Sequence, residues 1–439
     1  MKKNYFSLLL LLCATFTMAQ NNDFTNGGGD FLWSNTANWS LSVIPNTTNT
    51  GQVRLPLTVE SLVDVDVTVK KIQTTFATSG DAPVAGNATL TIDAGANAVF
   101  GIENVSDNDI NIIFRGNVTI NNTTTSGIQN TLMRNQNGNT NDVNGIIFDS
   151  GSVLTLNTPL EARAGSGGDV YNFNGSLAGT NALRVSANTI SNFGSTSDNS
   201  SFGGDFVWVG TNASMVVNTA DNGVFLPVDR KVQINGSNGS IEVNGENVFQ
   251  GNISINGSNS FLFNPTKNQN AMGTITFAGG AADGVLNIDV PGTVTTLAFA
   301  DNSASDWGSG TVNITGYQEG VFRFGTDNNG LTPAQLAQIT VDGSGGAIAL
   351  DSSGFLINAS SLSTEDFELN SKPIAYPTLA SNTIFFSKPQ ENVKVFDLNG
   401  RMILQNQSEN QVQIDVNSLA RGMYLIIFDN KKTEKFIKQ

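Results

Sequence analysis

Short runs of alternating apolar and polar residues fill most of the chain, and clusters of Asn, Gly, Ser and Asp separate them. The clearest run is LVDVDVTV at 62–69, which alternates strictly from Val63 onward as a half-buried strand does. Similar alternation recurs at 88–93 and 152–157. Asn and Gly dominate the breaks because both accept the left-handed backbone conformations that tight corners require. The pattern predicts an all-β protein, with 62–69 as one strand.

The strand pattern also repeats along the chain. The segment INGSN at 234–238 recurs at 255–259, an offset of 21 residues. A period in the low twenties fits one coil of a β-solenoid, in which each coil packs only on its neighbours. The repeat predicts a right-handed parallel β-helix with coils of ~22 residues, about fifteen of them over residues 24–357. A string of β-sandwiches is the alternative, but no linker divides the body into pieces of that size.

One helix is expected near the end of the solenoid. Thr332 suits an N-cap, Pro333 suits the first helical position, and AQLAQ at 334–338 can form a turn or two. We expect this short helix to cover the last coil.

The N-terminus has the pattern of a signal peptide. Lysines at 2–3 precede an apolar run at 6–12, and TMA at 17–19 puts small residues where a signal peptidase cuts. The order predicts a cleaved signal peptide over residues 1–19. A lipoprotein anchored through Cys13 is the alternative, but a leucine precedes that cysteine and no second anchoring signal accompanies it.

Missing residue types narrow the chemistry. Cys13 is the only cysteine, and the chain has no histidine. Residues 20–439 therefore form no disulfide, no Ser-His-Asp or Cys-His nucleophile system and no His or Cys metal site. Carboxylate chemistry remains open.

The charge is uneven. The chain holds 22 Lys+Arg and 37 Asp+Glu. Residues 372–439 contain nine of the basic and six of the acidic residues, and residues 1–19 contain two lysines, which leaves a net charge of −20 on residues 20–371. An acidic body argues against nucleic acid and anionic membrane surfaces as partners. Solubility explains this charge most simply, with cation binding as the alternative.

Paired carboxylates are the first candidates for chemistry. Asp64 and Asp66 would share one strand face, as would Asp107 and Asp109. Such pairs serve glycoside hydrolysis when they are held at the right distance. The solvated face of an alternating strand produces the same spacing without any function.

Oxygen ligands and tryptophans are the remaining candidates. The segments DNSASD at 301–306 and GGD at 167–169 could offer oxygens to calcium, although neither matches a complete calcium-binding loop. Tryptophans can stack on sugar rings. Trp33 and Trp39 more simply close the N-terminal end of the solenoid, where an exposed strand edge invites aggregation. The other two tryptophans are Trp208 and Trp307.

Several motifs of the body belong together. The closing stretch 306–357 includes DWG, VNITG and LTPAQLAQI, and the runs NFNGSL at 172–177 and FGGD at 202–205 precede it. With these motifs, most of the body resembles secreted proteins with autotransporter-associated β-strand repeats. The opening Trp33, Trp39 and Pro45 also look like the start of such proteins. The resemblance implies a parallel β-helix and says little about activity.

The C-terminus carries a more specific pattern. A Tyr-Pro pair opens it, VKVFDLNGR at 393–401 predicts strand, Asn-Gly turn and strand, and GMYLII at 422–427 follows. The segment 372–439 resembles a type IX secretion system type-A sorting domain. With the few residues that precede the domain, the resemblance covers about 366–439. The family usually continues Tyr-Pro with Asn-Pro, where this chain has Thr-Leu. The resemblance implies a small Ig-like β-sandwich that the translocon recognises. Its motif residues are Tyr376, Pro377, Asn399, Gly400, Gly422 and Tyr424.

Together these patterns predict a signal peptide at 1–19, a β-helix body at 20–357, a linker at 358–371 and a sorting domain at 372–439. We expect a secreted or surface-attached adhesive or structural protein, without enzyme activity and without a cofactor, with calcium as the weaker alternative. Its expected partners are the type IX translocon and extracellular glycans or other cell surfaces, and not nucleic acid. The alternative is a polysaccharide-binding or polysaccharide-degrading protein. A groove lined by several acids with Arg or Lys would favour that alternative, whereas a face of only Asn, Ser and Thr would favour the structural role.

Overall fold

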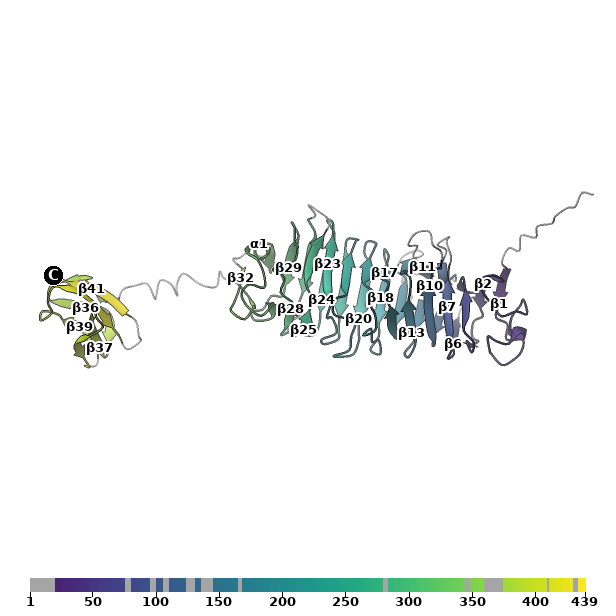
Figure 1. Cartoon of the computed structure of the whole chain (residues 1–439), viewed down its shortest axis with the longest axis horizontal. Coiled ribbons are helices and arrows are strands. Elements are labelled where there is room, and N and C mark those ends of the chain that lie inside the picture. Colours follow the sequence, from purple (N-terminus) through teal and green to yellow (C-terminus); the bar gives the residue numbers. More distant parts are fainter. Residues whose placement is uncertain are drawn as a thin grey trace, which may run out of the picture. The chain divides into compact units, whose positions relative to one another are not determined.

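The computed structural model describes residues 20–75, 80–94, 100–105, 110–123, 131–135, 145–164, 168–278, 283–343, 348–358, 374–408, 410–428 and 433–439. The chain divides into two compact units, residues 1–359 and 360–439 (Figure 1). The predicted signal peptide and nearly all of the predicted linker lie outside the described residues. Residue 358, predicted as the start of that linker, instead ends strand β33.

Three parallel faces make up the first unit, and the chain passes from one face to the next as it coils (Figure 1). The first sheet contains β1 (Gln20–Asp23), β2 (Thr50–Leu55), β5 (Ile72–Thr74), β8 (Phe100–Asn104), β11 (Thr131–Asn135), β14 (Leu160–Ala164), β17 (Leu183–Val185), β19 (Phe206–Trp208), β21 (Lys231–Ile234), β23 (Asn252–Asn256) and β26 (Ile275–Ala278).

The second sheet contains β3 (Ser61–Leu62), β6 (Gly80–Ala85), β9 (Ile110–Phe114), β12 (Gly145–Phe148), β15 (Val170–Phe173), β18 (Ile190–Phe193), β20 (Ser214–Val217), β22 (Gly239–Val243), β24 (Ser260–Pro265), β27 (Val285–Asp289), β29 (Thr311–Thr315) and β31 (Ile339–Val341).

The third face begins with β4 (Val67–Val69), β7 (Thr89–Asp93), β10 (Asn117–Asn121), β13 (Val153–Leu156) and β16 (Ser176–Gly179). Isolated parallel bridges, Gly179 with Phe202 and Leu226 with Phe249, continue it. It ends with β25 (Gln269–Met272), β28 (Leu297–Phe299) and β30 (Phe322–Phe324). The predicted parallel β-helix is therefore confirmed.

The coil length varies more than the repeat suggested. Ile234 pairs with Ile255, as the 21-residue offset predicts. Asn117, however, pairs with Val153, which lies 36 residues further along the chain. Because coils longer than 22 residues occur in both halves of the body, the second sheet has twelve strands, and the predicted count of about fifteen coils is wrong.

Residues 62–69 are not one strand, as the alternation predicted. β3 ends at Leu62 and β4 begins at Val67, and the chain turns a corner of the β-helix between them. The alternation misled because the polar residues of a corner can face solvent as regularly as those of a strand. The other two predicted strands are confirmed as β7 and β13.

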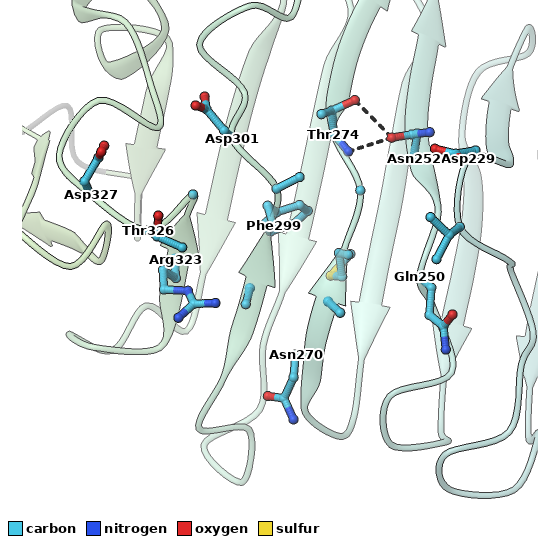
Figure 2. Close-up of a pocket in the computed structure, with 17 residues that line it drawn as sticks. Asp229, Gln250, Asn252, Asn270, Thr274, Phe299, Asp301, Arg323, Thr326 and Asp327 are labelled. Atoms are coloured by element: carbon cyan, nitrogen blue, oxygen red, sulfur yellow. Dashed lines mark hydrogen bonds between the residues drawn. The ribbon is translucent and has the colours of Figure 1, made fainter.

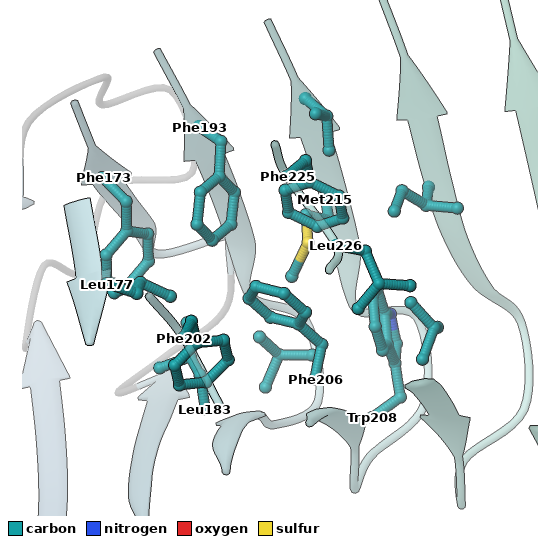
Figure 3. Packing of buried hydrophobic residues seen from close by; sticks show 14 of the residues in the cluster. Phe173, Leu177, Leu183, Phe193, Phe202, Phe206, Trp208, Met215, Phe225 and Leu226 are labelled. Carbon is teal, nitrogen blue, oxygen red and sulfur yellow. The ribbon is translucent and has the colours of Figure 1, made fainter. Parts of the chain in front are cut away.

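Stacked aromatic rings fill the interior (Figure 3). Phe114, Phe148, Phe173 and Phe193 occupy equivalent register positions on four successive strands of the second sheet. Their ring centroids lie 5.1, 5.5 and 5.0 Å apart, with nearly parallel planes. All four side chains are buried. A repeated Phe at one register position stabilises both the core and the register, since a slip of one residue would turn the rings to solvent.

Asparagines at the corners connect the coils. Asn222 and Asn247 have φ of 62° and 56°, in the left-handed region that Asn tolerates well. The Asn247 side-chain amide donates to the Asn222 side-chain oxygen at 3.1 Å. At Gly179, with φ of 89°, asparagine cannot replace glycine, because an added Cβ would lie 2.4 Å from the carbonyl oxygen of Leu156. The abundance of Asn and Gly in the breaks is thus a requirement of the corners.

Both ends of the first unit are covered. At the N-terminal end, near the 3₁₀ helix η1 (Thr36–Asn38), Trp39 donates through Nε1 to the Trp33 carbonyl at 2.8 Å. At the other end, α1 (Pro333–Leu336) has the predicted Thr332 cap, in a reciprocal pair with Gln335. The antiparallel pair β32 (Ile348–Leu350) and β33 (Leu356–Asn358) follows, and Phe355 bridges the edge of β30.

The second unit is a small β-sandwich with its own core. One sheet contains β34 (Ala375–Tyr376), β36 (Thr383–Gln390) and β39 (Gln411–Asp415). The other contains, in spatial order, β35 (Leu379–Ala380), β41 (Thr433–Lys438), β40 (Gly422–Ile427), β37 (Val393–Asp397) and β38 (Met402–Asn406). Ile384 and Phe386 of the first sheet bury against residues of the second such as Val395 and Ile426. In the described part of the chain no helix is long and apolar enough to cross a bilayer.

Candidate functional site

The sorting motif is spread over both sheets of the second unit. Tyr376 lies on β34, pairs with Phe385 of β36, and is about half exposed. The two rings lie 6.0 Å apart on the outside of the three-stranded sheet. Pro377 follows at an exposed position. This part of the motif therefore lies at the surface, where a partner can reach it.

Asn399 and Gly400 form the predicted turn between β37 and β38. The Asp397 side chain accepts from the backbone N–H groups of Asn399 and Arg401, at 3.0 and 2.9 Å. Gly400 has φ of 76°, and only Gly takes that conformation without cost. The backbone bonds of Asp397 and Arg401 close the loop and fix the hairpin.

Gly422 and Tyr424 lie on β40. Tyr424 is a core residue: its ring stacks on Phe436 at 5.6 Å, and its hydroxyl donates to the Ala420 carbonyl at 2.9 Å. Nothing in the structure requires glycine at 422, since an added Cβ would make only an ordinary contact with the Tyr424 ring. The motif thus combines surface residues with residues that serve the fold.

The candidate carboxylates Asp64 and Asp66 both accept hydrogen bonds from neighbouring segments of the β-helix. Asp64 accepts from the Ser34 backbone N–H at 2.9 Å and from its hydroxyl at 2.5 Å. Asp66 accepts from the Thr89 N–H at 2.8 Å. Each carboxylate therefore connects its corner to an adjacent coil. Asp107 and Asp109 lie outside the described residues.

The candidate calcium segments are also occupied by internal bonds. Buried Asn302 accepts from the Ile275 N–H at 2.7 Å and donates to the Ala300 carbonyl at 2.7 Å. Asp306 accepts from the Gly308 N–H at 2.9 Å. In the second segment residue 167 is not described, and Asp169 is buried. Among the described residues, no three His, Cys, Asp or Glu side chains are grouped as a metal site.

The tryptophans do not form a sugar platform. All four, Trp33, Trp39, Trp208 and Trp307, are at most 3 % exposed. Trp33 and Trp39 pack edge to face near the N-terminal end, as the closing role predicted. Their rings are core, so no aromatic face is presented to a ligand.

A groove that the sequence did not reveal lies on the third face of the β-helix, over β25, β28 and β30 (Figure 2). Its volume is about 630 Å³. Leu297 and Phe299 of β28 point into the core, so Ala298 between them points outward. Ala271, Gly273 and Ala300 also line the groove. Small outward side chains at neighbouring positions therefore leave the surface hollow.

Arg323 forms one wall of this groove. Its backbone pairs with Ala298 of β28 and bridges Phe355 on its other side. The guanidinium carbon lies 6.0 Å from the centre of the Phe355 ring, within the range of a cation–π contact. Arg323 Nε is buried and has no hydrogen-bond partner among the described residues. Arg323 also forms no ion pair with any described residue.

Three exposed carboxylates surround the same groove: Asp229, Asp301 and Asp327 (Figure 2). Asp301 accepts from the Ser303 N–H at 2.8 Å, and the hydrogen bonds from Ser303 lower the pKa of Asp301. Asp327 accepts from the Asn329 N–H at 2.8 Å. Each carboxylate keeps acceptor capacity for a ligand, and the groove as a whole is acidic with one cation.

Amide and hydroxyl groups complete the lining. Gln250, Asn252, Asn270, Thr274 and Thr326 all contribute to it. Asn252 uses its side-chain oxygen for the N–H and hydroxyl of Thr274, at 2.7 and 3.0 Å. A surface of carboxylates, amides and one guanidinium is equipped to bind hydroxyl groups. Two features of the sequence could have revealed the groove. They are the outward-facing Ala in LAFA at 297–300 and the outward-facing Arg in FRF at 322–324.

Comparison with known proteins identifies one part of the chain. A family described as the secretion system C-terminal sorting domain matches residues 375–439. Comparisons with curated proteins and with solved structures find no match. The likeness of the body to autotransporter-associated repeat proteins stays a prediction. Residues 375–439 are thus a type IX secretion system sorting domain, which marks the protein as secreted or attached to the cell surface.

Proposed function

We propose that the exported β-helix is an adhesive surface protein that binds a neutral polysaccharide in the groove over β25, β28 and β30, without cleaving it. The observation that carries the proposal is the position of Arg323 beside Asp301 and Asp327 in a hollow of about 630 Å³. A groove with acids and a basic residue is the feature that favours polysaccharide binding over a purely structural role. Its net negative charge favours neutral over acidic chains.

Binding is proposed rather than cleavage because of the carboxylates. A glycosidase needs one carboxyl group with a raised pKa to protonate the leaving oxygen. Asp301 is exposed, and hydrogen bonds from Ser303 lower its pKa, which keeps it ionised near neutral pH. An open groove also does not exclude water from a reacting bond. Asp301, which lies beside Arg323 in the groove, therefore does not fit the role of general acid.

A purely structural role is the second candidate, and the Asn ladders favour it. Asn192 donates to Asn172 at 3.0 Å, and Asn313 donates to Asn287 at 3.1 Å. These amides connect coils, so part of the Asn-rich surface already has its hydrogen bonds. Under this alternative the body is a stable spacer, and the groove has no ligand.

A glycan array probed with the mature protein, residues 20–439, separates these candidates. We expect binding to neutral polysaccharides, weakened about 10- to 100-fold by Arg323→Gln or Asp301→Asn, since each change removes a charge-assisted hydrogen bond of ~1.5–3 kcal/mol. Arg115→Gln is the matched control, because Arg115 is ion-paired to Glu60 away from the groove. Binding to no glycan, or equal binding by all variants, would favour the spacer. New reducing ends from the bound polymer would contradict the absence of cleavage.

A further inference from the structure

Exposed apolar side chains are concentrated in the C-terminal domain. Among the described residues, fourteen large hydrophobic side chains are exposed, and nine of them lie in the domain. The nine are Tyr376, Leu379, Phe385, Leu398, Met402, Ile403, Val412, Met423 and Ile437. The much longer β-helix accounts for only five. Contiguous exposed apolar surface usually marks an interaction site.

The strand register gathers several of these residues on one face. In the five-stranded sheet, Leu379 pairs with Ile437, and Ile437 pairs with Met423. Directly paired residues point to the same side of a sheet, so these three form a row. The row is 49, 42 and 40 % exposed, respectively. Its position is on the outside, because the neighbouring Tyr424 and Phe436 are buried in the core.

A second row extends the same face. Leu425, two residues after Met423, pairs with Phe396 of β37, and Phe396 pairs with Met402 of β38. Phe396 and Leu425 are half-buried, and Met402 is 49 % exposed. We call Leu379, Phe396, Met402, Met423, Leu425 and Ile437 the apolar face. A sandwich sheet normally presents polar residues on its outer side, so this sheet is apolar on both sides.

Lysines border the apolar face. Lys435 pairs with Leu425, and Lys394 pairs with Ile427, which puts both cations on the outer side of the sheet. Glu434 belongs to the inner side: it pairs with Ile426, and its carboxylate accepts from the N–H groups of Ile374 and Ala375 at 2.7 and 2.8 Å. At the described strand positions of the outer side there is no carboxylate to balance the lysines.

We infer that the apolar face is the surface with which the sorting domain docks on a protein of the type IX secretion machinery. The complementary surface on that protein is apolar and bordered by carboxylates. A second copy of this chain fits poorly, because two such faces would bring Lys394 and Lys435 of both copies together. The inference rests on the sorting role of residues 375–439 and adds which surface performs it.

Export of the full-length chain in a host with the type IX system tests this inference. The double substitution Met423→Thr with Ile437→Thr makes the face polar with residues that suit strands. We expect the extracellular fraction to fall at least about tenfold, as loss of a central apolar contact pair weakens docking. The control is Val412→Thr, which removes an exposed apolar side chain outside both the apolar face and the sorting motif. Normal export of the control and loss of export in the first double variant support the inference.

A second variant separates docking from folding. Lys394→Glu with Lys435→Glu reverses the charge of the border without altering the core, and we expect it also to reduce export by at least about tenfold. Normal export of both face variants, or an equal loss in the Val412→Thr control, would overturn the inference. So would a wild-type protein that dimerises through this face by light scattering, or that binds phosphatidylglycerol vesicles through it. If wild-type residues 366–439 fail to export a reporter at all, the sorting role fails instead.

Discussion

The two units of this chain treat their apolar residues in opposite ways. The β-helix buries them in one continuous interior, where Phe148 and Phe173 stack at 5.5 Å, and leaves its Asn-rich corners to connect the coils. The small sandwich has an ordinary core but also exposes Met423 and Ile437 on its outer side. Charge follows the same division, with a net of −20 on residues 20–371 and a small basic excess after residue 371. The body combines a net negative charge with buried apolar groups, whereas the apolar and basic surface of the domain is suited to contact another protein.

The largest effect should come from the aromatic ladder, which distinguishes the interior of the body. Phe173→Ala removes a buried ring that contacts two others, and we expect a loss of about 3–5 kcal/mol in the unfolding free energy of the body. Tryptophan fluorescence in urea measures this directly, because all four tryptophans belong to the body. Hydrogen exchange of peptides from 374–439 should not change. A matching loss of protection there would mean that the two units do not fold independently.

The corner asparagines should have an intermediate effect. Asn247→Ala removes the side-chain hydrogen bond that Asn247 donates to Asn222 and the one that it accepts from the Asn270 N–H, and it leaves a residue with a Cβ at a φ of 56°. Together these changes should cost about 3 kcal/mol in unfolding free energy. Asn247→Gly keeps the backbone conformation and loses only these two hydrogen bonds, so its cost should be about 2 kcal/mol. The same fluorescence measurement applies. Equal losses in the two variants would show that the left-handed conformation carries no cost at this corner.

Within the sorting domain, the motif residue Tyr424 should matter more for the stability of the domain than for its recognition. Tyr424→Phe removes the hydroxyl bond to Ala420 and keeps the ring against Phe436, so we expect a loss of about 1 kcal/mol. Hydrogen exchange of 420–428 should rise while export stays near wild type. If export stopped with the domain still folded, Tyr424 would have to contact the translocon.

The smallest effect concerns charge inside the body. Lys71 and Arg134 both form ion pairs with Glu103, and burial together with the nearby Arg134 lowers the pKa of Lys71 to about 8 from 10.5. The folded chain then binds fewer protons than the unfolded chain between pH 8 and 10.5, so stability rises with pH across that window. Relative to Lys71→Met, the wild type should gain up to about 1 kcal/mol between pH 7.5 and 10, after allowance for partial exposure. A flat difference between the two proteins would contradict the lowered pKa.

The sequence predicted the fold more completely than the site. The repeat INGSN correctly predicted the register in which β21 pairs with β23. The Tyr-Pro and Asn-Gly pairs correctly located the sorting domain. The corner at 63–66 was missed because alternation of side chains does not reveal where hydrogen bonding between strands stops. The groove was missed because Ala298 and Arg323 are 25 residues apart and become neighbours only through the pairing of β28 with β30.

The apolar face was missed for a related physical reason. GMYLII at 422–427 has no polar residue after its glycine, so its composition alone fits a strand buried on both sides. Only the sheet order shows that Met423 and Leu425 face outward with nothing of the chain over them among the described residues. Pairing thus decides which apolar residues are core and which are surface.

The central claim is that the C-terminal domain, and not the β-helix, directs export. It is tested most directly by attaching the domain to another protein and by removing it from this chain. A signal peptide, a fluorescent reporter and residues 366–439 should place the reporter outside a host with the type IX system, while residues 1–365 without the domain should stay in the periplasm. Export then depends on the small sandwich and not on the β-helix. A reporter retained in the periplasm, or a body that leaves the cell without residues 366–439, would contradict this account.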